Sequence, residues 1–240
     1  MFFKRITKKI FNKAGFDIVR YPPMNQIIKR RMKLISFYDI NLIFDVGANI
    51  GQYAKQMRNR GYKGRIVSFE PLSSAYKKLV ENSSADPLWN TVNIALGDNE
   101  RTTEINIAGN SYSSSILDML PKHLSSAPDS VYVGKKVVIV RRIDSIISDY
   151  FHSSDKLFLK IDTQGYEKNV IDGAENSIDK IAGIQLEMSL VPLYKGETLF
   201  LEIINLLKQK GYTLMSLEPG FSDPSTEQLL QVDGIFFRQV

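Results

Sequence analysis

The sequence predicts an α/β fold with a mostly parallel, doubly wound sheet that has helices on both faces. Two observations support this prediction. Short apolar runs typical of buried strands alternate with amphipathic segments typical of helices from residue 42 to about residue 210. The first apolar run begins at residue 42 and becomes polar at Asp45, after which come a loop with two glycines and then a helical apolar pattern.

Length and composition indicate one α/β domain, since the chain has 240 residues of which 43% are hydrophobic. The chain has no cysteine, which excludes disulfides and thiolate metal sites, and two histidines leave little for zinc. We therefore assign no metal site. Residues 1–33 hold ten basic residues and one acidic residue, a net of +9, whereas the whole chain carries +5. The formal net charge of the rest of the chain is therefore about −4, so we expect no nucleic-acid partner.

The basic residues lie in an N-terminal extension that we assign to residues 1–38, followed by the domain at residues 39–240. Residues 1–20 form an amphipathic pattern that suits either peripheral contact with an anionic membrane or packing on the domain. Pro22 and Pro23 then break the pattern, and residues 24–38 predict a second basic helix. The apolar stretch is too short and too charged to span a bilayer, so we expect a cytoplasmic protein, with contact at the inner membrane surface under the first interpretation.

The glycine loop predicts a nucleotide-like cofactor above the carboxyl end of the first strand. Its glycines, Gly47 and Gly51, are four positions apart, and Asp45 stands where the dinucleotide fingerprint has its first glycine. This departure argues against NAD. An acidic side chain at the start of the loop suits the ammonium group of S-adenosylmethionine, which makes a methyl donor the favoured hypothesis.

The next two strands supply further cofactor-binding candidates. Residues 65–69 predict a strand that ends at Glu70, placed to accept hydrogen bonds from ribose hydroxyls. Ser73 begins a helix, and residues 91–96 predict the third strand. Asp98 follows this strand and either accepts a bond from an adenine amino group or only stabilises a turn.

Residues 102–140 interrupt the alternation and predict an insertion that caps the substrate. Residues 103–107 and 136–140 are strand-like, and the serine- and proline-containing stretch between them includes His123. This histidine is either a catalytic base or, more commonly for a surface loop, a solvated side chain.

The catalytic candidates follow the next strands. A short helix at 143–151 precedes a strand at 156–161, after which comes Asp162, and a strand at 183–186 ends in Glu187. Lys160 lies within an apolar strand and needs a charged partner. Asp162 is the first choice for the base or for orienting the acceptor, and Glu187 is the second. The alternative is that either carboxylate only neutralises Lys160.

The C-terminal part predicts how the sheet closes. Residues 197–210 form an amphipathic helix that ends at Gly211. The strands at 212–217 and 232–237 follow without a helix between them. This connection predicts an antiparallel last strand.

Four sequence blocks resemble the FkbM-type S-adenosylmethionine-dependent methyltransferases. They are DVGANIGQY at 45–53, FEP at 69–71, ALGD at 95–98 and KIDTQGYE at 160–167. The resemblance covers residues 42–240 and implies a class I methyltransferase (Rossmann-like) sheet of seven strands. The resemblance, together with the positions of residues at strand ends, indicates the following cofactor-binding candidates: Asp45, Gly47, Ala48, Asn49, Gly51, Gln52, Glu70, Pro71, Ala95, Leu96 and Asp98.

The resemblance implies O-methylation of a hydroxyl on a sugar, glycan, glycolipid precursor or polyketide-like product. The acceptor stays open because the variable insertion selects it. Two other functions are compatible with the residues: an NAD-dependent oxidoreductase, or a non-catalytic methyltransferase fold that tethers other enzymes to a membrane.

Overall fold

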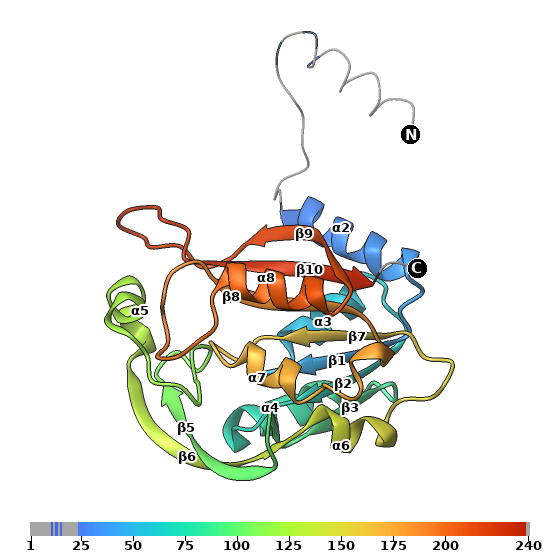
Figure 1. Ribbon diagram of the computed structural model, residues 1–240, viewed down its shortest axis with the longest axis horizontal. Coiled ribbons are helices and arrows are strands. Elements are labelled where there is room, and N and C mark those ends of the chain that lie inside the picture. The colour runs from blue at the N-terminus through green and yellow to red at the C-terminus, as the bar shows by residue number, and fades with distance from the viewer. Residues whose placement is uncertain (1–10, 12, 14, 16–23, 239–240) are drawn as a thin grey trace.

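The computed structural model describes residues 11, 13, 15 and 24–238, and it is built around a seven-stranded sheet (Figure 1). The strand order is β3 (Trp89–Val92), β2 (Arg65–Phe69), β1 (Leu42–Val46), β7 (Leu157–Ile161), β8 (Ile181–Ser189), β10 (Gln231–Arg238) and β9 (Tyr212–Pro219). The first five strands pair in parallel, whereas β10 is antiparallel to both β8 and β9. The predicted fold class and the antiparallel last strand are confirmed.

Helices cover both faces of the sheet because successive strand side chains point to opposite sides. In β1, Ile43 belongs to the core beneath α2 (Met24–Phe37), α3 (Gln52–Asn59) and α4 (Ser73–Ser83), and its neighbours Leu42 and Phe44 belong to the core on the other face. The helices over that other core are α6 (Ile143–Ile146), α7 (Glu167–Asp172) and α8 (Phe200–Gln209). Short 3-10 helices η2 (Ile147–Asp149) and η3 (Ile178–Lys180) complete this side.

The second basic helix, α2, is part of the domain rather than an appendage to it. Ile28, Arg31 and Ile35 are buried along its inner side, and Ile35 packs in the core shared with α3. The boundary assigned at residue 38 therefore cuts through packed structure. The amphipathic pattern of residues 1–20 lies almost entirely outside the described residues. Among the described helices, none is long and apolar enough to cross a bilayer.

The predicted third strand is wrong in one respect, because it divides between two sheets. β3 ends at Val92, and β4 (Ala95–Leu96) pairs in parallel with β6 (Tyr132–Arg141) in a separate three-stranded sheet. Asn93 marks the turn, since its side chain donates hydrogen bonds to the carbonyls of Glu70 and Pro71. The sequence shows one apolar run here, whereas the chain changes sheets within it.

The insertion forms most of the second sheet, in which β6 lies between β4 and β5 (Arg101–Ala108) (Figure 1). The segment between β5 and β6 contains α5 (Pro121–Ser126) and the 3-10 helix η1 (Pro128–Ser130). Ile105, Val138 and Val140 pack with Leu72 at the start of α4, so the insertion is fixed to the main domain by an apolar contact.

The two loop glycines are required by packing within the protein. Gly47 has φ +71°, and a Cβ there would lie 1.9 Å from the backbone oxygen of Asp162. Gly51 has φ +87°, and a Cβ there would lie 2.6 Å from the Trp89 ring. The absence of a Cβ at these two positions therefore allows close contact between the β1–α3 loop, the end of β7 and β3.

We predict that Gly47→Ala destabilises the fold by about 3 kcal/mol or more, because alanine combines a left-handed backbone with a steric clash. Urea unfolding followed by circular dichroism measures the change. Gly134→Ala is the matched control, since no atom lies within 4 Å of its Cβ position, and we expect a change under about 1 kcal/mol. Equal stability of the Gly47 variant and the wild type would contradict this account of the loop.

Candidate active site

A pocket of about 440 Å³ lies at the carboxyl ends of the central parallel strands. It extends from the β1–α3 loop and the end of β2 to β8 and β10, and residues 111–116 of the insertion contribute one wall. Asp45, Gly51 and Asp98 lie outside its lining. The predicted site residues that line it are Gly47, Ala48, Asn49, Gln52, Glu70, Pro71, Ala95, Leu96, Lys160, Asp162 and Glu187.

Glu70 is fixed at one end of the pocket by two backbone donors. Its Oε2 accepts a bond from the amide of Asn49 at 2.8 Å, and its Oε1 accepts one from the amide of Leu72 at 2.8 Å. Each carboxylate oxygen has a second acceptor site, so both can still receive a ligand donor. Burial raises the Glu70 pKa to about 7. Its charge therefore changes close to neutral pH.

Asp45 and Lys160 form a buried ion pair behind the pocket floor. The two residues are register partners on β1 and β7, and Lys160 Nζ lies 3.2 Å from Asp45 Oδ1. Asp45 is fully buried and also accepts a bond from the Ser68 hydroxyl at 3.2 Å. The role of Asp45 in holding the cofactor ammonium stays a prediction, and the structure places its carboxylate outside the pocket lining, where it neutralises Lys160.

A second carboxylate completes the neutralisation of Lys160. Asp162 Oδ2 lies 3.5 Å from its ammonium, and the carbonyl of Gly47 accepts a bond at 3.5 Å. Burial alone would lower the Lys160 pKa, but the charges of Asp45 and Asp162 outweigh burial and raise it. Lys160 therefore remains a cation that joins the loop after β1 to the end of β7.

Glu187 has different neighbours from those expected. Gln164 Nε2 donates to Asp162 at 2.9 Å and to Glu187 at 2.8 Å, and Gln231 Nε2 also donates to Glu187 at 2.8 Å. Burial, reinforced by the nearby carboxylate of Asp162, raises the Glu187 pKa well above its usual value. Among the residues that the structure describes, no ion pair joins Glu187 to Lys160, whose charged partners are Asp45 and Asp162.

The chain shares its central motifs with one known family. The model of the FkbM methyltransferase domain matches residues 45–214, which is well over half of the chain. The chain belongs to the FkbM methyltransferase family. This excludes the NAD-dependent oxidoreductase interpretation and agrees with the observed strand order.

Relatives of this FkbM methyltransferase include proteins of different size. The 2-O-methyltransferase NoeI of Sinorhizobium fredii (strain NBRC 101917 / NGR234) is 25% identical over 196 residues, which cover 79% of this chain and 80% of NoeI. The AMB antimetabolite synthetase AmbE of Pseudomonas aeruginosa is 26% identical over 178 residues, and the match covers 61% of this chain but 8% of AmbE. The chain therefore corresponds to a small part of AmbE.

A solved structure supports the fold. The methyltransferase FkbM from Methylobacillus flagellatus KT superposes with a TM-score of 0.51 at 16% identity. The alignment covers 82% of this chain and 44% of that one, so this chain spans less than half of the solved protein. The similarity applies to the methyltransferase fold.

Sequence reasoning missed an acidic residue and a basic residue at the far end of the FkbM pocket. Asp233 on β10 lies directly opposite Glu187 on β8 and lines the pocket. Burial raises its pKa to about 6. Arg31 comes from α2, where it is buried, pairs with Glu218 of β9 and donates to Gln56 at 3.0 Å. An acidic residue near the start of the predicted strand 232–237 was the available signal for Asp233.

Two other candidates lie away from the pocket. Asp98 accepts bonds from the Tyr166 hydroxyl at 3.0 Å and from Arg101 at 3.3 Å, so its carboxylate is engaged outside the lining. His123 is buried in α5, 5.1 Å from the Tyr194 ring between centroids, and burial lowers its pKa to about 4. The interpretation of His123 as a solvated surface side chain is wrong.

We predict that Asp45→Asn destabilises the protein by about 3 kcal/mol, because it leaves the buried Lys160 with only the partly exposed Asp162 as a charged partner. The measurement is the urea midpoint at neutral pH. The double variant Asp45→Asn/Lys160→Met removes the charge together with its partner and should recover most of the loss. A double variant as unstable as the single one would show that the ion pair is not the cause.

Proposed function

We propose that this FkbM-family enzyme transfers a methyl group from S-adenosylmethionine to a hydroxyl of a sugar, glycan or glycolipid precursor. One observation carries the proposal. A single pocket runs from Glu70, a buried acceptor at the end of β2, to the carboxyl groups of Asp162, Glu187 and Asp233. It therefore combines a surface suited to a nucleoside with groups suited to a hydroxyl.

The residues near Glu70 fit the adenosine part of the cofactor. Glu70 has one unused acceptor site on each oxygen for the ribose hydroxyls, and the apolar side chains of Ala95, Leu96 and Ile105 line the adjacent wall. When bound, S-adenosylmethionine supplies a methyl group on a positively charged sulfur. Displacement at that carbon needs an aligned hydroxyl, so positioning provides much of the rate.

The opposite end of the pocket has groups that can hold and deprotonate a hydroxyl. Lys160 and Gln164 hold the Asp162 carboxylate, which suits it to orient the acceptor. The Asp233 carboxylate has no hydrogen-bond partner among the residues that the structure describes, and its pKa of about 6 leaves it ionised but basic at neutral pH. We assign proton removal to Asp233 and hydrogen-bond donation to Glu187.

The acceptor class is supported by the lining and by one relative. The amide side chains of Gln56, Gln164 and Gln185 line the acceptor end together with the carboxyl groups. Such a set of donors and acceptors matches a compound with several hydroxyls. The relative NoeI is named a 2-O-methyltransferase, which favours oxygen as the methylated atom.

Two measurements test the proposal. Calorimetric titration compares S-adenosylhomocysteine with NAD, and transfer of a radioactive methyl group is then measured with a panel of glycosides and polyketide-like alcohols. Binding of S-adenosylhomocysteine and methylation of a glycoside are expected. A protein that binds neither compound would support the non-catalytic tether, and methylation confined to polyketide-like alcohols would overturn the sugar assignment.

We predict that Glu70→Gln weakens S-adenosylhomocysteine binding by about 1 to 2 kcal/mol, since one carboxylate acceptor is lost. The pH dependence provides a sharper readout. The ionised carboxylate is the better acceptor, so wild-type affinity should rise as pH increases through about 7 and level off above it. The Gln variant should show no such rise. Calorimetry between pH 6 and 8.5 measures both, and a parallel pH profile in the variant would remove Glu70 from the site.

We predict that Asp233→Asn lowers kcat at least about 100-fold, because the hydroxyl loses its base. In the wild type, kcat/KM should rise as pH increases through about 6, and this rise should disappear in the variant.

Asp162→Asn should retain cofactor binding and mainly raise the acceptor KM. Asp149→Asn, an exposed change in η2, is the control. A wild-type profile in the Asp233 variant would exclude it as the base.

A further inference from the structure

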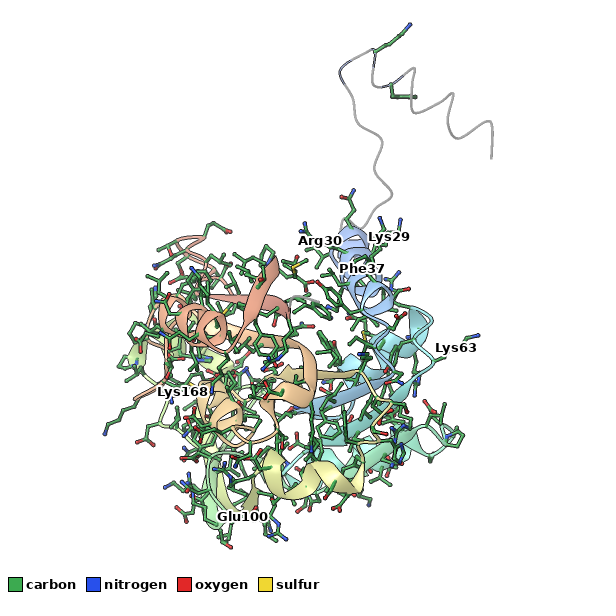
Figure 2. All side chains as sticks on the ribbon, turned by 45° about the vertical axis from the view of Figure 1, so that its right-hand side comes forward. Lys29, Arg30, Phe37, Lys63, Glu100 and Lys168 are labelled. Carbon is green, nitrogen blue, oxygen red and sulfur yellow. The ribbon has the colours of Figure 1, made fainter. Side chains whose placement is uncertain are left out.

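The helix α2 has two chemically different sides. Its inner side packs Ile28 and Ile35 into the domain and places Arg31 at the acceptor end of the pocket. Its outer side exposes Lys29, Arg30, Lys33 and Phe37 to solvent. Figure 2 labels Lys29, Arg30 and Phe37 on this outward side. A single helix therefore contributes to the pocket on one side and to a basic surface on the other.

Few acidic groups of the protein neutralise the positive charge on the outer side of α2. The helix contains no acidic residue. Lys29 and Lys33 are four positions apart, where like charges repel each other, and neither has an ion-pair partner in the part of the chain that the structure describes. Arg30 is tied to the fold by a bond to the Met215 carbonyl at 2.8 Å. The surface thus keeps a positive charge available for an external partner.

Phe37 favours an anionic membrane over a nucleic acid as the partner of this basic surface. Its ring is 76% exposed, the highest value among the large apolar side chains that the structure describes. An exposed aromatic ring on the same side as lysines suits an interface where an apolar layer lies beneath anionic headgroups. A nucleic-acid backbone offers the charges without that layer. The sequence before α2 extends the basic character, since residues 1–23 hold six basic residues and one acidic residue, a net of +5.

We propose that the outer side of α2, formed by Lys29, Arg30, Lys33 and Phe37, is a docking surface for an anionic lipid bilayer. The lysines and arginine contact headgroups, and Phe37 enters the interfacial layer. Because Arg31 lies on the same helix, docking would fix the acceptor end of the pocket at a set distance from the membrane. This last consequence rests on the proposed function, and an acceptor on a lipid carrier would gain effective concentration.

Vesicle sedimentation of the full-length chain tests the docking surface. The wild type should sediment with vesicles of phosphatidylglycerol and phosphatidylcholine, and not with phosphatidylcholine alone. Lys29→Glu/Lys33→Glu should weaken binding about tenfold or more, since each basic residue contributes substantially at an anionic surface. Phe37→Ser should leave a weaker interaction that depends more strongly on salt. Lys77→Glu/Lys78→Glu on α4 makes the same change in net charge on another exposed surface and should bind like the wild type.

Several outcomes would overturn the proposal. They are absent binding of the wild type, unchanged binding of the α2 variant, or an equal loss in the α4 control. A gel-shift measurement with single-stranded RNA is run in parallel, and loss of RNA binding without loss of vesicle binding would also reject a membrane partner. Calorimetry with S-adenosylhomocysteine is a separate readout. It shows whether the α2 variant is folded and still binds the cofactor product, so that a failure of docking is distinguished from a failure of the proposed cofactor binding.

Discussion

The buried charge of Lys160 is the constraint on which the site depends. An ammonium within an apolar parallel strand is tolerated because Asp45 and Asp162 neutralise it and the carbonyl of Gly47 accepts a bond from it. These contacts hold the β1–α3 loop against the end of β7, where any side chain larger than glycine at position 47 would overlap the Asp162 backbone. These contacts within the protein position the loop and the strand end relative to each other, which suits a reaction that depends on alignment.

Polar contacts continue across one face of the sheet from this centre. The Trp89 indole donates to the Ser68 hydroxyl, and that hydroxyl donates to Asp45. On the other side, Gln185 is the register partner of Lys160 and accepts a bond from Tyr53 at 3.2 Å. A polar layer thus spans several strands between the sheet and its helices. It connects the strand that carries Glu70 with the strands that carry Glu187 and Asp233.

Much of the fold and half of the site were predictable from sequence because they depend on local order. Strand ends followed by Glu70 and Asp162 place those residues on one edge of a parallel sheet, and the structure confirms that placement. Sequence reasoning did not reveal which residues lie side by side on neighbouring strands. Sequence position places Asp45 near the end of a strand, but it does not show that Lys160 lies beside it. Arg31 and Asp233 reach the same pocket from opposite ends of the chain, and no local pattern relates them.

The reversed direction of β10 has a consequence for the order in which the pocket is assembled. Glu70 and the glycine loop belong to the first third of the chain, so the nucleoside end can form early during synthesis. Asp233 faces Glu187 only after β10 has inserted between β8 and β9. A chain that lacks β10 therefore has Glu70 and the glycine loop but not the pair of facing carboxyl groups at the other end of the pocket.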